Sequence, residues 1–515
     1  MASDYAQIIA GLAHPEAYPH PADRFTHIET HASHVFLVGD FAYKLKKPVD
    51  LGFLDFSTLD RRRFFCEEEL RLNRRLAPDT YLAVVPITGT PAAPRMGGEG
   101  EALEYAVRMH RFPQNALLSR RRVTPDIVDA IADRVAAFHE SIPIAPLESG
   151  YGRQELVLAP MLANLAVLRQ GSIGTVEGPR LGAIEAWTRS RFPILAGIIE
   201  RRRLGGRVRE CHGDLHRDNI AELDGRLIIF DCLEFNPALR WIDTINEVAF
   251  LAMDLAGGDA PELARRFLNR YLERSGDYDG VILLDLYRVY RAMVRAKVTA
   301  IRLSQPGLEA NEVLHYRREL ARYLDLAEDY TREHPRRLVL THGRSGSGKT
   351  HLSNILRERL RLIHVRSDVE RKRLFGLRPE DRVGPAAWLY TPQATARTYG
   401  RLLEVARSIL AGGCGALVDA TFLRRSQRAP FLALASEVGV PCTILSLEAP
   451  EPVLRARVAK RVAEGCDASD ADIAVLEAQT QANEPLAPEE AACAIAVRTY
   501  PGPDLDDLLR RLAEG

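Results

Sequence analysis

The stretch His212-Gly213-Asp214-Leu215-His216-Arg217-Asp218-Asn219 contains an aspartate and an asparagine in the pattern H-x-D-x-x-x-x-N. Downstream of it, the turn signal Leu223-Asp224-Gly225 predicts a β-hairpin whose second strand ends at Asp231. Such a hairpin would bring Asp231 back to the loop that contains Asn219, so that both side chains could bind Mg²⁺. Asp214 would accept the proton of a substrate hydroxyl. The stretch therefore predicts half of a phosphoryl-transfer site, with Asp214 as catalytic residue and Asn219 and Asp231 as metal ligands.

The residues before position 112 predict a small lobe that is built around a sheet. Period-two alternation over 35–48 predicts a hairpin, and a helix is predicted over about 58–76. Strands are expected at 81–88 and 103–109, and the Pro- and Gly-rich residues 93–101 are expected to form a loop. This order of elements is typical of a kinase small lobe.

Two lysines in the predicted hairpin are candidates for contact with the phosphates of a nucleotide. Lys44 and Lys46 share one face of its second strand. We expect Lys44 to bind phosphate and Glu69, on the predicted helix, to orient it. Lys46, with Glu67 or Glu68, is the alternative pair. The competing interpretation of Lys44 is an exposed strand lysine.

The rest of the chain changes from helical to alternating patterns. From about 114 to 200, and again from about 240 to 331, the periodicity is mainly helical, and the polar stretch 328–335 indicates a linker. Beyond the linker, short apolar segments alternate with helical ones, which is typical of a parallel sheet with helices on both faces. Strands are expected at 337–341, 361–366, 416–420 and 442–447.

A second phosphate-binding signature follows the first of these strands. The residues Gly343-Arg344-Ser345-Gly346-Ser347-Gly348-Lys349-Thr350 match G-x-x-x-x-G-K-[ST]. In such a loop, backbone N–H groups surround the phosphates, Lys349 reaches the β and γ oxygens, and the Thr350 hydroxyl binds Mg²⁺. The helix that begins near Lys349 adds the positive end of its dipole. The eight residues therefore predict a nucleotide-binding loop.

Charged residues after the loop complete this second site. Asp419 ends an apolar run, as a carboxylate that orders Mg²⁺ through water would do. Asp368 follows a predicted strand and is expected to bind or deprotonate an acceptor hydroxyl, with helix N-capping as the alternative. Arg457 and Arg461 are one helical turn apart and could face the transferring phosphate from a lid. Arg371 or Lys372 could hold an anionic acceptor.

The first motif carries a resemblance to a known family. His212-Gly213-Asp214 through Asn219, Phe230-Asp231 and the run Arg240-Trp241-Ile242-Asp243 are similar to the aminoglycoside phosphotransferase and choline kinase superfamily over roughly residues 30–330. The resemblance implies a bilobal protein-kinase-like module and, for Asp243, a role in supporting the catalytic loop. His212 is interpreted as a hydrogen-bonding residue that holds the loop. The sequence departs from the wider kinase pattern because no G-x-G-x-x-G loop is found in the small lobe.

The second half resembles another group. Its phosphate loop, Arg366-Ser367-Asp368 and Val418-Asp419-Ala420-Thr421 are similar to P-loop kinases of the gluconate kinase and zeta-toxin-like group over roughly 336–500. Together the halves look like bacterial proteins in which a phosphotransferase domain is joined to an ATP-binding domain. The expected fold class is multidomain, α+β followed by α/β. We expect a small lobe at 1–111, a large lobe at 112–330, a linker at 331–336 and a P-loop domain at 337–515.

Composition excludes several other classes of protein. The 69 basic and 69 acidic residues give a formal net charge of zero, which argues against a nucleic-acid-coating protein. The seven cysteines contain no CxxC pair, so neither a zinc ribbon nor a disulfide framework is indicated. No apolar run approaches the roughly 18 residues of a membrane span, and the N-terminus lacks the pattern of a secretory signal. A cytoplasmic location is therefore expected.

These patterns predict an ATP- and Mg²⁺-dependent phosphotransferase that acts on a hydroxyl of a small molecule through its first module. The second module would transfer phosphate or sense it. Two further interpretations stay open for the P-loop half, namely a regulatory nucleotide switch and a kinase for polynucleotide ends or nucleotide sugars. Neutral net charge argues against a nucleic-acid partner. The sequence does not identify the acceptor, and it leaves both the interplay of the modules and homo-oligomer formation open.

Overall fold

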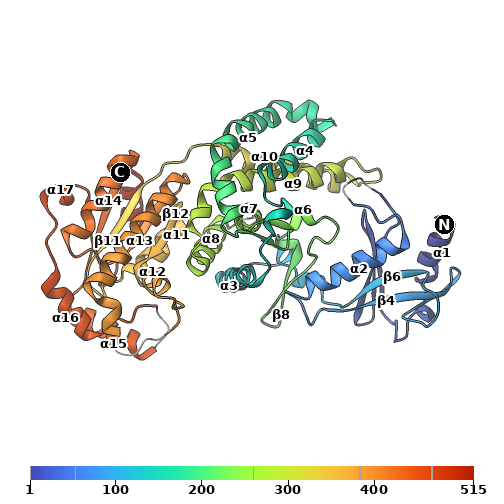
Figure 1. The fold of residues 1–515 in the computed structure, drawn as a ribbon, viewed down its shortest axis with the longest axis horizontal. Coiled ribbons are helices and arrows are strands. Elements are labelled where there is room, and N and C mark those ends of the chain that lie inside the picture. The colour runs from blue at the N-terminus through green and yellow to red at the C-terminus, as the bar shows by residue number, and fades with distance from the viewer. Residues whose placement is uncertain are drawn as a thin grey trace. The chain divides into compact units, whose positions relative to one another are not determined.

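The computed structural model describes residues 2–50, 52, 54–170, 172–258, 260–381, 386–464 and 468–514, and Cys466 lies outside these ranges. The chain forms two compact units, each assembled from separate segments (Figure 1). Unit 1 comprises Met1–Thr124, Phe138–Pro160 and Ala196–Asp254, and unit 2 comprises Pro125–Ala137, Met161–Leu195 and Leu255–Gly515.

Unit 1 contains a six-stranded antiparallel sheet in the order β1-β2-β3-β6-β4-β5. The predicted hairpin and the two predicted later strands are present. The prediction of a loop at 93–101 is wrong in part, because Ala93–Met96 pairs with β4 as an edge strand, where prolines are tolerated. The strands are β1 (Phe25–Glu29), β2 (Ser33–Val38), β3 (Phe41–Lys46), β4 (Tyr81–Thr90), β5 (Ala93–Met96) and β6 (Glu104–His110).

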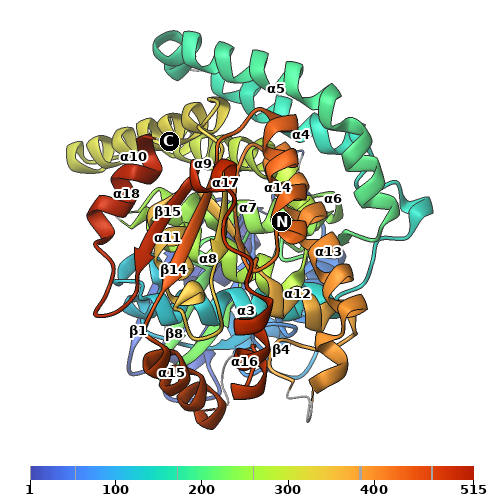
Figure 2. The same ribbon diagram turned by 90° about the vertical axis from the view of Figure 1, so that its left-hand side faces the viewer.

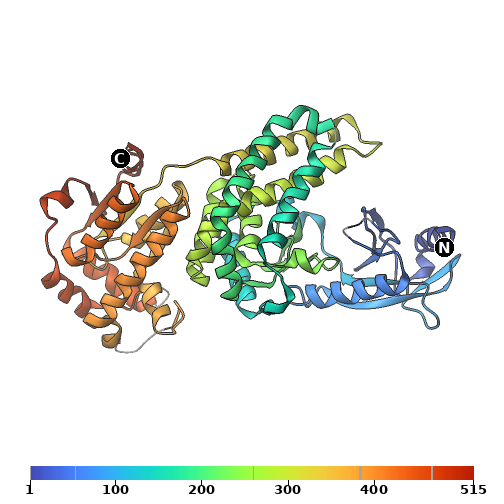
Figure 3. The ribbon, with the colours of Figure 1, turned by 45° about the horizontal axis from the view of Figure 1, so that its top comes forward.

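Helices cover the apolar faces of this sheet. Helix α1 (Ala2–Gly11) contributes Ile8, which packs in a cluster with strand residues such as Phe36 and Ile87. Helix α2 (Leu59–Asn73) begins after Thr58, whose hydroxyl accepts a hydrogen bond from the Arg61 amide, as expected of a helix cap. Figure 3 shows α2 running along the sheet of unit 1.

The first motif lies between short strands of unit 1. Strand β7 (Val208–Glu210) leads into it, and β8 (Ile220–Leu223) and β9 (Arg226–Ile229) form the predicted hairpin after it. Asp224 and Gly225 have φ angles of 50° and 77°, both in the left-handed region that a type I′ turn requires. Strand β10 (Trp241–Asp243) pairs with β7, and α7 (Thr244–Ala256) follows.

Unit 2 contains a five-stranded parallel sheet in the order β12-β13-β11-β14-β15 (Figure 2). Its strands are β11 (Leu338–His342), β12 (Leu362–Arg366), β13 (Gly415–Asp419), β14 (Cys442–Glu448) and β15 (Ala494–Arg498). The first four confirm the predicted strands, and β15 was not predicted. Their buried side chains, among them Val339, Leu417 and Leu445, form one core with helices α11 (Lys349–Arg359) and α18 (Leu505–Glu514). The fold class is therefore confirmed.

The remaining helices belong to unit 2, to unit 1 or to both units. Unit 2 contains α8 (Pro261–Ser275), α9 (Leu284–Leu303), α10 (Ala310–Thr331), α11 (Lys349–Arg359), α12 (Ser367–Leu374), α13 (Pro392–Ala411), α14 (Arg425–Val438), α15 (Glu451–Glu464), α16 (Ile473–Ala482), α17 (Pro488–Ala491) and α18 (Leu505–Glu514). The units share α3 (Pro125–Ser141), α4 (Gln154–Arg169) and α5 (Ser172–Leu204), and α6 (Pro237–Arg240) is in unit 1. Within the described ranges, no helix combines the length and apolar character needed to cross a membrane.

Candidate functional site

The structure brings Asp214 and Asn219 into direct contact. The Asn219 amide nitrogen Nδ2 donates to Asp214 Oδ2 at 3.0 Å and to the Asp214 carbonyl at 2.9 Å. His216 Nε2 lies 3.2 Å from the same carboxylate oxygen. Because the side-chain nitrogen Nδ2 faces Asp214, the side-chain oxygen Oδ1 of Asn219 is the atom that can bind a metal ion. The Asp214 side chain is 30% exposed, so a substrate hydroxyl can reach it.

Asp231 is tied to this loop through its neighbour. The Phe230 amide donates to the Asn219 carbonyl at 3.0 Å, and the Phe230 carbonyl accepts from His212 Nε2 at 2.8 Å. Asp231 itself has a φ of 62°, which is uncommon for a residue other than glycine. Its amide donates to the Tyr81 hydroxyl at 3.2 Å. A strained backbone held by such contacts is characteristic of functional sites.

The catalytic loop rests on a buried histidine and a buried glutamate. His212 donates from Nε2 and accepts the Asp214 amide at Nδ1 (3.2 Å), which requires the neutral ring. Burial lowers the pKa of His212, in agreement with that state. Glu247 accepts the Gly213 amide at 2.7 Å and bonds His139 at 2.7 Å. His212 therefore has the predicted hydrogen-bonding position, and Glu247 supports the loop.

Two other residues near the loop have structural contacts. Asp243, for which the resemblance implied support of the loop, accepts Arg202 Nε and Nη2 at 2.8 and 2.7 Å and the Ile245 amide at 2.9 Å. Its contribution to the loop is thus indirect, through strand β10. Cys211 lies with His139 and Glu247 in a cluster whose ligand atoms are within 4.8 Å of one another. Since His139 and Glu247 already bond each other and Cys211 faces the Ile242 carbonyl at 3.6 Å, we interpret the cluster as structural.

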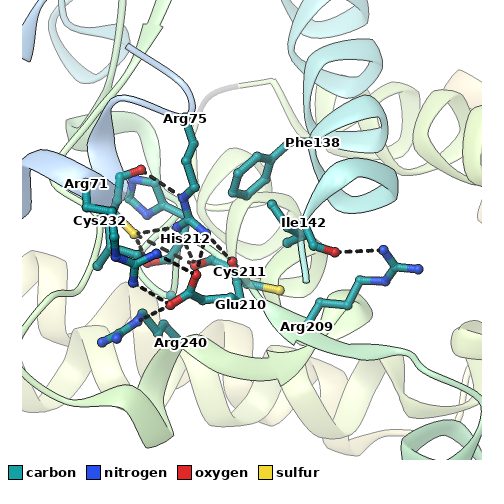
Figure 4. Close-up of polar contacts among 12 residues, drawn as sticks. Arg71, Arg75, Phe138, Ile142, Arg209, Glu210, Cys211, His212, Cys232 and Arg240 are labelled. Carbon is teal, nitrogen blue, oxygen red and sulfur yellow. Dashed lines mark hydrogen bonds and ion pairs between the residues drawn. The ribbon is translucent and has the colours of Figure 1, made fainter. Parts of the chain in front are cut away.

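Arg71 of α2 and Arg75, which follows that helix, bind strand β7, which leads into the catalytic loop (Figure 4). Arg71 donates to both carboxylate oxygens of Glu210, at 2.8 and 3.1 Å. Arg75 donates to the Glu210 carbonyl at 2.6 Å and to the Cys211 carbonyl at 3.2 Å, and Arg240 reaches Glu210 at 3.2 Å. These bonds connect the helix that contains Glu69 to the strand that ends before His212.

The predicted lysine and glutamate also meet in unit 1. Lys44 Nζ lies 2.9 Å from Glu69 Oε1 and 2.6 Å from Asp231 Oδ1. The second candidate lysine, Lys46, contacts Glu69 Oε2 at 2.8 Å and also the carboxylate of Glu234. Glu67 and Glu68, the glutamates considered as partners of Lys46, pair with Arg63 and Arg71 instead. Glu69 is therefore shared by both lysines, and only Lys44 also reaches Asp231.

Burial and charge act in opposite directions in this cluster. Burial alone would raise the pKa of Glu69, but Lys44 and Lys46 outweigh it and lower that pKa. Burial likewise opposes charge on Lys44, and the carboxylates of Asp231 and Glu69 reverse the effect, so the pKa of Lys44 is raised. Burial raises the pKa of Glu234. Glu234 was not predicted from the sequence, because its position shortly after Asp231 was the only signal for it.

Replacing Lys46 by Met is expected to lower the free energy of unfolding by about 3–5 kcal/mol, because it leaves the buried carboxylate of Glu234 without its cation and Glu69 with Lys44 alone. Urea unfolding of the full chain measures this. The loss should shrink as pH falls, since Glu234 can then take up a proton. Lys47→Met is the matched control, because its partner Glu29 is 61% exposed, and it should cost less than about 1 kcal/mol. Equal losses in both variants would contradict a special role of the Lys46 contacts.

In unit 2 the phosphate loop joins β11 to α11. Gly343, Gly346 and Gly348 have φ angles of 146°, 82° and 89°. A Cβ atom on Gly343 or Gly346 would lie 2.7 Å from a backbone carbonyl oxygen, that of Leu447 or Leu454. Both the backbone conformation and the space therefore require glycine, as expected of a loop that wraps closely around phosphate.

Lys349 lies across this loop. Its Nζ donates to the carbonyls of Gly343 and Arg344 at 3.0 and 2.9 Å. Burial lowers the pKa of Lys349 to about 8, although the nearby carboxylates of Asp419 and Asp368 act in the opposite direction. Phosphate oxygens would give the ammonium a stronger partner than these carbonyls.

Thr350 and Asp419 meet as the motif predicts. Thr350 Oγ1 donates to Asp419 Oδ2 at 2.7 Å, and His364 Nε2 approaches the same oxygen at 3.2 Å. Both bonds fall on Oδ2, which leaves Oδ1 for a metal-bound water. Burial raises the pKa of Asp419, but His364 and Lys349 outweigh it, and the pKa falls to about 2. Sequence analysis missed His364, because a histidine inside an apolar strand gives no local signal.

The other residues of the phosphate loop are held by later elements. Arg344 donates to Glu451 at 2.6 Å and to Thr480 at 2.9 Å, and the Ser345 amide donates to Gln479 at 2.7 Å. The Ser347 carbonyl accepts from a threonine hydroxyl that follows β15, at 2.8 Å. Helix α16, which contains Gln479 and Thr480, was not predicted to contact the loop.

The predicted lid arginines contact the loop region unequally. Arg457 donates to the Gly346 carbonyl at 3.2 Å, so it lies at the phosphate loop. Arg461 donates to the Ala471 carbonyl at 2.7 Å and is close enough to lower the pKa of Lys349. Arg457 is thus the better placed of the two to face a nucleotide.

The predicted acceptor residues lie on α12. Asp368 is half-buried near the start of the helix and acts electrostatically on Lys349 and Tyr390. Arg371 instead donates to the Leu389 carbonyl at 2.8 Å, and Lys372 pairs with an aspartate at 3.1 Å. Both basic residues are almost fully buried. They are engaged in internal contacts, which argues against their role in holding an anionic acceptor.

Comparisons with known proteins identify a domain in the second half of the chain and relatives of nearly the whole chain. A family model described as an AAA domain matches residues 338–486, which contain the phosphate loop. The uncharacterized protein Rv2004c of Mycobacterium tuberculosis is 31% identical over 477 residues, which cover 91% of this chain and 92% of that protein. The uncharacterized protein Mb2027c of Mycobacterium bovis matches with the same identity and coverage.

Three solved structures with some similarity to this chain are distant from it in sequence. A choline/ethanolamine kinase family protein from Mesorhizobium loti has 13% identity and a TM-score of 0.35, covering 64% of this chain and 100% of that one. Amicoumacin kinase hAmiN has 16% identity and a TM-score of 0.39, covering 63% and 95%. A putative kinase from Chloroflexus aurantiacus has 21% identity and a TM-score of 0.29, covering 35% and 94%.

The first site gathers Asp214, Asn219, Asp231 and Lys44, and the second joins the glycine-rich loop to Thr350 and Asp419. They occur in one chain, and the alignment with the mycobacterial relatives covers nearly all of it. The chain therefore belongs to the family of these mycobacterial proteins, and its residues 338–486, which contain the phosphate loop, match the AAA domain.

Proposed function

We propose that the first module transfers the γ-phosphate of ATP to a hydroxyl group of a small molecule. The observation that supports this most directly is the contact of Asp214 with Asn219 in a loop that is tied to Asp231. Lys44, which is paired with Glu69, supplies a cation beside Asp231. These are the groups that a phosphoryl transfer requires.

The residues fit Mg²⁺ and ATP by the chemistry of their donor atoms. Asn219 offers an amide oxygen and Asp231 a carboxylate, which are the hard oxygen ligands that Mg²⁺ prefers. Bound Mg²⁺-ATP would supply the phosphoryl group and neutralise its charge. Asp214 accepts the proton of the acceptor hydroxyl at Oδ1 or Oδ2, while Asn219 and His216 keep its carboxylate oriented. Lys44 can move from Asp231 to a phosphate oxygen while Glu69 continues to hold it.

We also propose that the P-loop module binds Mg²⁺-ATP through Lys349, Thr350 and Asp419, and that Asp368 serves as its acceptor-side base. Thr350 offers an oxygen ligand and Asp419 a carboxylate that can order Mg²⁺ through water, and the glycine conformations allow the tight path that a phosphate-binding loop takes. A regulatory switch is the competing function, and Asp368 separates the two. Asp368→Asn should abolish transfer by this module if it is a kinase and should leave nucleotide binding and regulation intact if it is a switch.

The experiment that tests the proposal is ADP release by the full chain with Mg²⁺-ATP. The acceptor panel contains sugars, amino sugars, aminoglycosides and amino alcohols, together with a 5′-hydroxyl oligonucleotide that tests for polynucleotide kinase activity. Stimulation by one acceptor that Asp214→Asn abolishes would support transfer by the first module. Stimulation that depends on Lys349 and Asp368 but not on Asp214 would move the catalytic assignment to the P-loop module.

A further inference from the structure

Helix α8 of unit 2 covers the edge of the parallel sheet with a side-chain amide. Strand β12 is the outermost strand of that sheet, so one side of its backbone has no strand partner. Asn269, in α8, donates from Nδ2 to the Leu362 carbonyl at 3.1 Å and accepts the His364 amide at Oδ1 at 2.7 Å. Leu362 and His364 are alternate residues on the same edge. The side chain of Asn269 therefore makes the two hydrogen bonds that a further strand would make.

The strand residue that Asn269 holds is also the one that contacts the metal-binding carboxylate. His364 Nε2 lies 3.2 Å from Asp419 Oδ2, the oxygen that accepts from Thr350 at 2.7 Å. His364 is fully buried, and its Nδ1 has no hydrogen-bond partner within the described residues. Its proton is thus on Nε2 and points at Asp419. Two hydrogen bonds, one at the backbone amide and one at the side chain of His364, thus link α8 to the candidate Mg²⁺ site.

A second residue of α8 acts on the same strand. Glu273 is one helical turn after Asn269 and faces Arg366 at 3.3 Å and Arg357 at 3.6 Å. Arg366 is the last residue of β12 and is followed closely by Asp368. Helix α8 therefore contacts β12 at His364 through Asn269 and at Arg366 through Glu273. Arg366 lies two residues before Asp368, the proposed acceptor base.

Simple packing does not account for these contacts. An apolar side chain would cover the strand edge and fill the same space, whereas a buried amide is tolerated only when its polar atoms are paired. Asn269 is 1% exposed, and both ends of its amide bond the backbone of β12. The arrangement fixes the position of β12 along its axis, and with it the direction of His364.

We propose that α8 is a built-in part of the P-loop site, and that Asn269 is a positioning residue that aligns Asp419 for Mg²⁺ through His364. Nucleotide binding by the P-loop would then depend on a helix that precedes the P-loop domain in the sequence. This inference rests on the proposed function of the P-loop module as a Mg²⁺-ATP site.

The test measures Mg²⁺ dependence of fluorescent ATP-analogue binding in the full chain. Every variant contains Lys44→Met, which silences the first site. Asn269→Leu keeps the volume and removes the two hydrogen bonds to β12, together with the bond that Nδ2 donates to the Arg265 carbonyl of its own helix at 3.0 Å. It should raise the Mg²⁺ concentration for half-maximal affinity by about 10-fold, the usual effect of displacing an outer partner of a metal ligand. Binding measured in EDTA should change little. Asn164→Leu is the matched control, because Asn164 is similarly buried in unit 2 and bonds Lys297 at 2.7 Å.

A second pair of variants keeps the test decisive if Asn269→Leu does not fold. His364→Leu should reproduce the Mg²⁺ shift while α8 keeps its contacts, and His364→Gln, whose amide can donate to Asp419, should restore part of it. A folded Asn269→Leu or His364→Leu variant with wild-type Mg²⁺ dependence would overturn the proposal. If instead Lys349→Ala has no effect on binding in the same background, the proposed nucleotide site itself fails, which is a different result.

Discussion

Replacing Asp214 by Asn is expected to reduce kcat for the acceptor hydroxyl by about 10²–10⁴-fold with little change in the KM for ATP. The amide keeps the shape of the side chain and its contact with Asn219, but it cannot accept the hydroxyl proton. In the proposed reaction Asp214 faces the acceptor, whereas Lys44 and Asp231, which contact each other at 2.6 Å, face the nucleotide. ADP release at saturating acceptor, for wild type and variant, measures the loss.

Asp224→Asn is the matched control for this change. Asp224 is exposed in the turn of the neighbouring hairpin with a φ of 50°, and Asn tolerates that conformation. The control should keep wild-type activity. Full activity in Asp214→Asn would show that another module or residue performs the transfer.

Replacing Lys349 by Ala is expected to weaken ATP binding at the P-loop by about 10²-fold or more, since charge-assisted hydrogen bonds contribute roughly 1.5–3 kcal/mol each. The ammonium of Lys349 donates to the loop carbonyls of Gly343 and Arg344, and burial lowers its pKa to about 8. Phosphate should reverse that shift. Binding of wild type should therefore weaken as pH rises above about 8, where the free lysine loses its proton. Titration calorimetry with ATP measures both effects.

Lys460→Ala serves as the control for the loss of one positive charge. Lys460 is on α15, its side chain is 75% exposed, and its partner is Glu464 at 3.6 Å. Its replacement should leave ATP affinity within about twofold, because exposed ion pairs contribute little. A comparable loss of affinity in both variants would indicate a general electrostatic effect, and an unchanged affinity in Lys349→Ala would exclude a functional P-loop.

Features encoded in a short stretch could be predicted from the sequence. The phosphate loop follows from its spacing and its glycines, and the hairpin after the catalytic loop follows from Asp224 and Gly225, whose left-handed conformations suit few other turn types. The pairing of Lys44 with Glu69 could be predicted because alternation fixes the face of a strand and helical periodicity limits the choice of partner.

Residues that act across long sequence separations could not be found in this way. Glu247 holds the Gly213 amide from a later helix, and Glu210 binds arginines of α2 and its end that precede it by more than a hundred positions. Glutamates are common on helices and strands, so neither residue gives a local signal. Likewise, Asn269 and His364 are ordinary in their own segments, and only the tertiary structure shows that they meet.

The side-chain amide of Asn269, which covers the edge of β12, also matters while the protein is being made. An uncovered strand edge invites pairing with other chains. During synthesis α8 leaves the ribosome before β12, so the strand meets its cover as soon as it emerges. A gene fragment that begins at the residues between α10 and β11 would encode the P-loop without that cover, and its product is expected to associate through β12.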